Sequence, residues 1–220
     1  MLIVHLMASP FVGGPERQVL GLARSLPPDC RTVVLSFAER GLSRPFLEKA
    51  EAEGFRAIRL EANAPRLFRA AREVAGWLTR LGADVLCCSG YKPDLIGWMA
   101  ARRAGVPAVA IAHGWTGATP KVRLNEALDR WVMRRMDAVA CVSEGMAAKV
   151  RRAGVPAERA PVIRNAIDAA AFGPPDPAMR EELLRLFPRR PDRLVAAVGR
   201  LSPEKGFDVL VEAAASMALR

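Results

Sequence analysis

Residues 198–208 have the sequence VGRLSPEKGFD, and this stretch shows the pattern on which the whole chain is built. A short apolar run leads into it and a helical apolar pattern follows it, which predicts a strand, a loop and the start of a helix. In open α/β sheets, ligands bind beyond the carboxyl ends of the strands. The loop contains Arg200 and Lys205, and two cations at such a place can bind a phosphate group.

The same alternation of strand-like and helical patterns runs through the rest of the chain. It predicts an α/β fold in which helices flank a parallel sheet. The expected strands are residues 2–7, 32–37, 57–60, 84–88, 108–112, 138–142, 161–163 and, near the end, 194–198.

Two expected helices have clear apolar faces. The first covers residues 16–26, after Gly13, Gly14 and Pro15, and its predicted buried face consists of Val19, Leu22, Ala23 and Leu26. The second covers residues 123–136, and its predicted buried face consists of Leu124, Ala127, Leu128, Trp131, Val132 and Met136. The helical spacing of the apolar residues in 123–136 favours a core position for Trp131 over a binding role.

Proline-rich polar sequence divides the chain. We predict one domain over residues 1–165 and a linker over residues 166–192, which contains a short helix near 179–186. Residues 193–220 are predicted to form one strand–helix unit of a second domain.

Composition limits the possible partners. The net charge of +10 favours an acidic partner, such as a nucleotide, a lipid phosphate or an anionic membrane surface, although a general bias towards arginine explains it equally well. Aromatic residues make up only 6% of the chain and no RNA-binding or helix-turn-helix signature is present, so we expect no nucleic-acid partner. No apolar run is long enough for a membrane span, the first residues do not resemble a signal peptide, and the four cysteines lack C-x-x-C spacing. We therefore expect a cytoplasmic protein, with peripheral contact at the inner face of the cell membrane as an extension of that expectation.

The two histidines differ in context. His5 lies inside the first expected strand, which favours a structural role, whereas His113 ends a strand and opens the loop His113-Gly114-Trp115-Thr116-Gly117. That position favours a catalytic or binding role for His113. The loop before the first helix, with Gly13 and Gly14, offers backbone N–H groups to an anion, although a simple turn into the helix is the alternative.

Several reaction classes lack their signatures. The chain has no G-x-S-x-G elbow, no Walker lysine loop and no His, Cys and carboxylate cluster with metal spacing. We therefore expect neither a metal nor a cofactor.

Four motifs together resemble glycosyltransferase family 4. They are GGPER at 13–17, CVSE at 141–144, IRNAID at 163–168 and GRLSPEKGFDVLVEA at 199–213. The HGWTG loop at 113–117 and the later LDRWVMRRMDAVACVSE at 128–144 resemble a bacterial polysaccharide-type subgroup of that family.

The resemblance implies the GT-B architecture, with two Rossmann-like domains, and transfer of a sugar from a nucleotide-sugar donor with retention at the anomeric carbon and without a bound metal. It implies a glycan or lipid-linked acceptor and a role in polysaccharide or cell-envelope glycoconjugate synthesis. By the same resemblance, Arg200, Lys205, Gly13 and Gly14 would bind the donor phosphates and His113 would contact the donor sugar. Trp115, Thr116 and Asn165 are candidate substrate contacts.

The chain departs from the family pattern in three places, the mildest of which is Asn125, where the subgroup often has Tyr. Ala166 stands where the hinge motif usually has Gly, so a left-handed turn there would be strained. The sequence reaches Arg220 without the family's E-x7-E region, whose glutamates would hold the donor sugar and ribose. We therefore expect a truncated chain that is weak or inactive alone. Two alternatives stay open: a GT-B nucleotide-sugar 2-epimerase, and a non-catalytic acceptor-recognition subunit that rests on an anionic membrane.

Overall fold

The computed structural model describes residues 1–117, 119–191, 194–199 and 201–218. The chain divides into two units, Met1–Ala169 and Ala170–Arg220. The predicted domain boundary at residue 165 stays a prediction.

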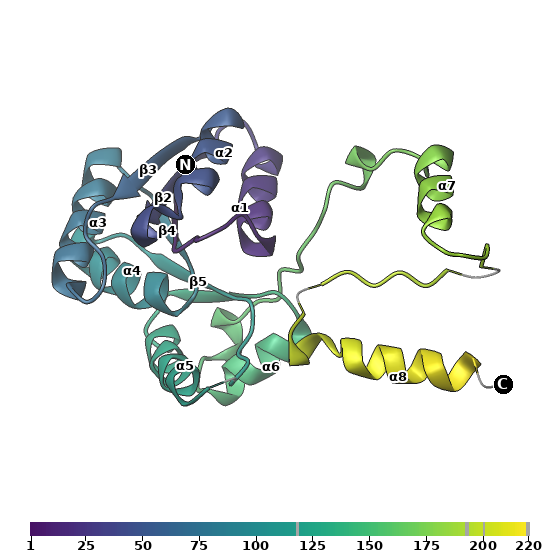
Figure 1. Cartoon of the computed structure of the whole chain (residues 1–220). Helices are drawn as coiled ribbons and strands as arrows, with labels where there is room; N and C mark the ends of the chain where they lie inside the picture. Colours follow the sequence, from purple (N-terminus) through teal and green to yellow (C-terminus); the bar gives the residue numbers. More distant parts are fainter. Residues whose placement is uncertain (118, 192–193, 200, 219–220) are drawn as a thin grey trace. The chain divides into compact units, whose positions relative to one another are not determined.

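A six-stranded parallel sheet forms the centre of the first unit (Figure 1). The strand order is β3-β2-β1-β4-β5-β6. Strands β2 and β3 are thus added on one side of β1, and strands β4, β5 and β6 on the other. The strands are β1 Leu2–Met7, β2 Arg31–Phe37, β3 Arg56–Leu60, β4 Val85–Ser89, β5 Ala108–Ala112 and β6 Ala138–Cys141. These six match the predicted strands to within one residue at each end. The expected strand at 161–163 is reduced to a single bridge between Cys141 and Val162.

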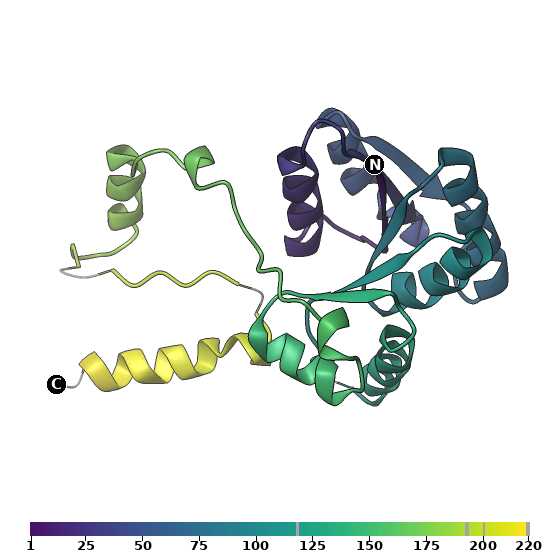
Figure 2. The same ribbon diagram turned by 180° about the vertical axis from the view of Figure 1, so that it is seen from behind.

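Helices cover both faces of the sheet. They are α1 Gly14–Ser25, α2 Arg44–Ala52, α3 Leu67–Leu81, α4 Tyr91–Ala104, α5 Pro120–Met133 and α6 Glu144–Arg152, with 3-10 turns at Glu39–Gly41 and Ala157–Arg159. Alternate residues of β2 show the two faces, because Val34 packs with α1 and α2 whereas Val33 and Leu35 pack with α3, α4 and α5. Figure 2 shows the same arrangement from behind. Such alternation is the expected result of the strand period of two.

The first helix begins with a carboxylate at its amino end. Pro15 lies in the first turn, and the Glu16 side chain accepts a hydrogen bond from the Gly13 N–H at 2.9 Å. The predicted buried face is partly wrong, since Leu22 is 47% exposed while Leu20 is buried. Val19 and Leu20 pack against Met7 of β1 and Val34 of β2, and Ala23 is buried on the same helix.

Helix α5 corrects a second prediction. Its buried residues are Asp129, Val132 and Met133, whereas Leu124 is 71% and Trp131 36% exposed. The predicted face is therefore only partly right: Val132 and Met136 are buried as expected, whereas Leu124, Leu128 and Trp131 are exposed. The reason is that Asp129 accepts a hydrogen bond from the indole of Trp115, which turns a polar face of the helix inward. Trp131 packs edge-on against Trp98 and carries the Arg135 guanidinium on its ring, instead of filling the core.

The second unit contains α7 Pro177–Arg185, α8 Phe207–Ala218 and 3-10 turns at Ala169–Ala171, on the boundary, and Pro203–Lys205. Asp176 caps α7 by accepting from the Ala178 N–H at 2.8 Å. The two predicted helices are thus present, but residues 194–198 form no strand and are exposed. A strand needs a neighbouring strand to satisfy its backbone groups, and the described part of this unit contains no other strand. In the described residues of this unit, Leu184 is the single buried side chain.

Two further findings bear on the predicted surroundings of the protein. No helix in the described ranges is long and apolar enough to cross a lipid bilayer. All four cysteines are free.

Candidate functional site

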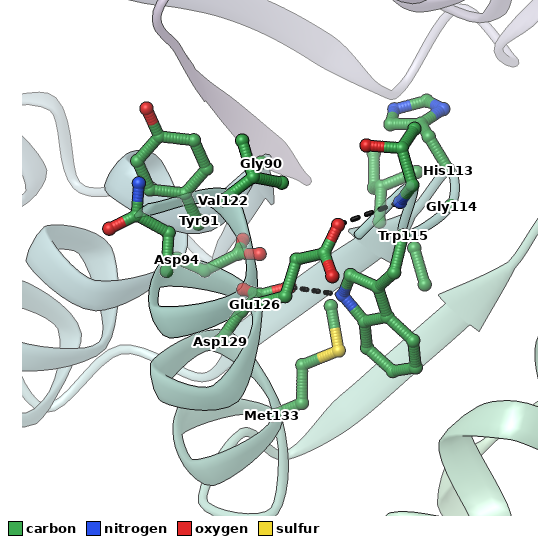
Figure 3. A pocket seen from close by; sticks show the side chains of 14 residues that line it. Gly90, Tyr91, Asp94, His113, Gly114, Trp115, Val122, Glu126, Asp129 and Met133 are labelled. Carbon is green, nitrogen blue, oxygen red and sulfur yellow. Dashed lines mark hydrogen bonds between the residues drawn. The ribbon is translucent and has the colours of Figure 1, made fainter. Parts of the chain in front are cut away.

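The loops that follow β1, β4 and β5 meet at the carboxyl edge of the sheet in the first unit. The strand order changes direction between β1 and β4, and this is the place where open α/β sheets bind ligands. A pocket of about 240 Å³ lies beside this place, at the ends of β4 and β5. Its walls are the ends of β4 and β5, the His113 loop and the inward face of α5 (Figure 3).

His113 lies at this pocket directly after β5. Its Nε2 atom is buried and has no hydrogen-bond partner in the described part of the chain. Burial lowers the pKa of His113, and the nearby Glu16 carboxylate offsets part of that shift. The imidazole is therefore neutral near pH 7, and a neutral imidazole offers one hydrogen-bond donor and one acceptor.

The glycine loop before α1 approaches the same site, as the electrostatic interaction between Glu16 and His113 shows. A Cβ at Gly13 would lie 2.7 Å from the Phe11 ring, so a larger residue here would displace that exposed side chain. The Gly13 N–H already donates to Glu16 and is occupied. A Cβ at Gly14 would meet no atom within 4 Å, which leaves open space beside the amino end of α1.

Two carboxylates of α5 hold the His113 loop. The Glu126 Oε1 atom accepts hydrogen bonds from the backbone N–H groups of Thr116 at 2.7 Å and Gly117 at 3.0 Å. The Asp129 Oδ2 atom accepts from Trp115 Nε1 at 2.9 Å, and Figure 3 shows this indole pointing towards α5. The Trp115 indole N–H and the Thr116 backbone N–H thus help to shape the loop, and contact of these two residues with substrate stays a prediction.

A second buried carboxyl group, Asp94, lies in the first turn of α4 and also lines the pocket. Burial, followed by the charge of Asp129 and a hydrogen bond to it, raises the pKa of Asp94 well above its ordinary value. Burial also raises the pKa of Asp129, while hydrogen bonds from Asp94 and Trp115 lower it in part. The site therefore contains a pair of interacting carboxyl groups at its base.

The sequence did not single out Asp94, Glu126 or Asp129. Glu126 is not part of the predicted apolar face of its helix, and Asp94 and Asp129 belong to different helices whose contact no local pattern records. The one available signal was spacing, because Glu126 and Asp129 are three residues apart and so share a helix face.

The remaining predicted site residues lie elsewhere. Asn165 is exposed in the segment after β6. Its neighbour Ala166 pairs through both backbone groups with the Gln18 carboxamide of α1, at 2.8 and 3.0 Å. Ala166 is not among the residues with positive φ, so the strained turn considered for it does not occur. Lys205 is exposed in the second unit, and Arg200 lies outside the described residues.

In the described residues, no group of three or more His, Cys, Asp or Glu side chains is arranged to hold a metal ion.

Fold and site together define an α/β protein with a Rossmann-like parallel sheet and a pocket at the carboxyl ends of β4 and β5. The family described as Glycosyltransferase Family 4 matches residues 12–171. The chain therefore belongs to glycosyltransferase family 4.

Known proteins agree with this assignment. A D-inositol 3-phosphate glycosyltransferase of Rhodococcus jostii is 33% identical over 135 residues, which cover 57% of this chain and 29% of that protein. The crystal structure of Anabaena HepE in complex with UDP-glucose superposes with a TM-score of 0.78 at 23% identity, over 98% of this chain and 57% of that one. A UDP-N-acetylglucosamine 2-epimerase superposes with a TM-score of 0.58 at 14% identity, over 82% of this chain and 54% of that one. The structural likenesses show a shared GT-B-type fold, and the chain spans little more than half of these solved chains.

Proposed function

We propose that this chain belongs to a retaining glycosyltransferase that transfers a sugar from a nucleotide-sugar donor to a glycan or lipid-linked acceptor, in the synthesis of a polysaccharide or a cell-envelope glycoconjugate. The observation that carries the proposal is His113, a neutral imidazole with a free, buried Nε2 atom at the pocket beside the glycine loop. Family membership supports glycosyl transfer as the reaction class. The complex of HepE with UDP-glucose supports a nucleotide-sugar as the donor class.

The size of the pocket suggests which part of the donor lies inside it. Its 240 Å³ falls just below the range of about 300 to 1,000 Å³ that is usual for drug-sized ligands. We infer that it takes a sugar ring and that the diphosphate lies outside it, over the open space beside Gly14. The amino end of α1 favours negative charge at this place.

In the proposed reaction, the bond between the anomeric carbon and the donor phosphate oxygen breaks, and the acceptor oxygen bonds to the anomeric carbon on the same face. The acceptor's proton passes to the departing phosphate oxygen. His113 holds a sugar hydroxyl through its free nitrogen, which fixes the ring relative to the leaving group. By the family resemblance, Lys205 and Arg200 would supply the positive charge that stabilises the departing diphosphate in place of a metal.

We expect the 220-residue chain to transfer sugar weakly. In the described residues of its second unit a single side chain, Leu184, is buried. A unit with so little apolar burial has little to offset the entropy of ordering its backbone, about 1 to 2 kcal/mol per residue. Lys205 is therefore not held as firmly as a charge-stabilising residue must be.

Replacement of His113 tests the proposal. With a panel of radiolabelled nucleotide-sugars and a membrane-lipid and glycan acceptor mixture, we expect His113→Ala to lower transfer at least tenfold relative to the unaltered chain. His5→Asn, a change of the other histidine away from the pocket, serves as the matched control, compared at equal folded fraction. Equal transfer by the unaltered chain and His113→Ala would contradict the role of His113.

One observation favours the epimerase alternative to a limited degree, because the pocket has more carboxyl groups than the sequence indicated. Glu126 and Asp129 are however engaged in holding the loop. Incubation with UDP-N-acetylglucosamine and no acceptor separates the two activities, since an epimerase would invert C2 and the proposed transferase would leave the sugar unchanged.

The outward face of α5 favours peripheral membrane contact as an accompanying property. Leu124, Leu128 and Trp131 are exposed, and Arg135 lies 3.6 Å from the Trp131 ring centroid. Exposed apolar side chains next to arginines can bind an anionic lipid surface. Sedimentation with anionic vesicles, reduced by Trp131→Ser and by high salt, is the expected result; no binding at low salt would remove this property.

A further inference from the structure

Two buried carboxyl groups join α4 to α5 beneath the His113 loop. Asp94 is 0% exposed and Asp129 is 5% exposed. Figure 3 shows them on facing helices at the base of the pocket. Two ionised carboxylates in such a place would repel each other strongly, because little water is present to screen them.

The two groups have unequal surroundings. Asp129 accepts from the Trp115 indole and lies near the positive charge of Arg130. In the described part of the chain, no N–H or O–H of another residue reaches either oxygen of Asp94, and the Oδ1 atom of Asp129 also lacks a donor. A single proton on Asp94 would remove one negative charge and supply the donor that Asp129 lacks.

We propose that Asp94 carries this proton in the folded protein, donates a hydrogen bond to Asp129, and so positions Trp115 and the loop that contains His113. Asp94 and Asp129 both line the base of the pocket, and both are buried with carboxyl oxygens that lack a hydrogen-bond partner in the described residues. Burial and the Asp129 charge raise the pKa of Asp94, which agrees with the assignment of the proton to this residue. Asp94 is a positioning residue, because it acts through Asp129.

The loop is held at two separate points, which gives Asp94 a distinct task. Glu126 fixes the backbone at Thr116 and Gly117, whereas Asp129 fixes the indole of Trp115. The orientation of the indole, two residues from His113, thus depends on where the Asp129 carboxylate points. The effect on catalysis rests on the proposed function, but the proton and the indole contact do not.

Other titratable groups surround Asp94 and Asp129, so the experiment must distinguish their titration from that of Asp94. They are Cys88 on β4, Tyr91 on α4, His113 on the loop, and Glu126 and Arg130 on α5. Asn in place of Asp94 has no ionisable proton, yet its amide can donate to Asp129 as a protonated Asp94 would. A difference between the unaltered chain and Asp94→Asn therefore reports on Asp94.

The indole N–H signals of the four tryptophans provide the test. In a ¹⁵N-labelled chain, Trp115→Phe identifies the Trp115 signal. We expect Asp94→Asn to keep that signal near its original position, and Asp94→Ala to shift it and to speed its exchange with solvent at least tenfold. Glu51→Gln, a change at an exposed carboxylate on α2, is the matched control and leaves the signal unmoved.

Each outcome decides the proposal without any activity assay. A folded Asp94→Ala chain with an unchanged Trp115 signal would overturn it, and so would a signal that is altered equally in Asp94→Asn and Asp94→Ala. If Asp94→Ala does not fold, a pH titration decides. The Trp115 signal of the unaltered chain is then expected to show an alkaline transition that Asp94→Asn lacks, and the same transition in both would overturn the proposal.

Discussion

At the scale of single residues, burial sets the protonation of the groups that matter in the first unit. The two histidines are neutral for related reasons but serve different roles. His5 is enclosed in β1, and burial lowers its pKa to about 4. His113 is partly buried at the pocket, where burial lowers its pKa and the Glu16 charge opposes part of that effect. Only His113 combines a neutral ring with access to a ligand.

The raised pKa of Asp94 predicts an unusual pH dependence of stability. Above the ordinary pKa of 3.8, the folded chain keeps a proton on Asp94 that the unfolded chain releases. The contribution of Asp94 to the free energy of unfolding is therefore fully present below pH 3.8 and is lost as the pH rises. The slope is about 1.4 kcal/mol per pH unit up to the folded pKa. We expect the advantage of Asp94→Asn over the unaltered chain, measured by urea unfolding, to grow from pH 5 to pH 8.

The contribution of His5 to the free energy of unfolding changes with pH in the opposite direction, because the pKa of His5 is lowered in the folded chain. It removes stability as pH falls from 6.5 towards 4, since the unfolded chain then binds a proton that the folded chain does not. This contribution is common to both proteins and cancels in the difference between them. A constant difference between pH 5 and pH 8 would show that Asp94 is ionised in the folded chain.

At the scale of elements, the strands of the first unit were predictable because apolar runs record them directly. The face of α5 was not, because apolar periodicity ignores a carboxylate that is buried by a hydrogen bond from another segment. Residues 194–198 were predicted as a strand from their apolar character, yet strand formation depends on a partner that the described part of the second unit lacks.

The same distinction applies to the candidate site. His113 and the two glycines follow strand ends, so the sequence alone indicates their place at the carboxyl edge of the sheet. Asp94 and Asp129 become a pair only when α4 packs against α5. Their contact arises from tertiary packing between segments far apart in sequence, and no motif within either segment reports it.

The link between α1 and the segment after β6 gives a prediction at this scale. Gln18 pairs with both backbone groups of Ala166. We expect Gln18→Met, which keeps the side-chain length but removes both hydrogen bonds, to speed amide exchange at Ala166 at least threefold. The free energy of unfolding should change by only about 1 kcal/mol, because the contact is exposed. Unchanged exchange at Ala166 would show that the pairing does not hold this segment.

At the scale of the whole molecule, the two units differ in how much core they contain. The first has apolar clusters on both faces of its sheet, whereas the described part of the second buries only Leu184. Local opening needs less free energy where fewer apolar contacts are lost. We expect the first cuts of limited proteolysis to fall within Ala170–Arg220 and to leave a resistant fragment of the first unit. Early cuts within the sheet unit would contradict this order of stability.

The central claim is that His113 marks the place where the donor sugar binds, and the presence of only two histidines makes it directly measurable. Titration with UDP-glucose is followed through the imidazole signals in the NMR spectrum, with His113→Ala to assign them. We predict a saturable shift of the His113 signal while the signal of the buried His5 stays constant. A His113 signal that does not move while calorimetry shows UDP-glucose to be bound would contradict the claim.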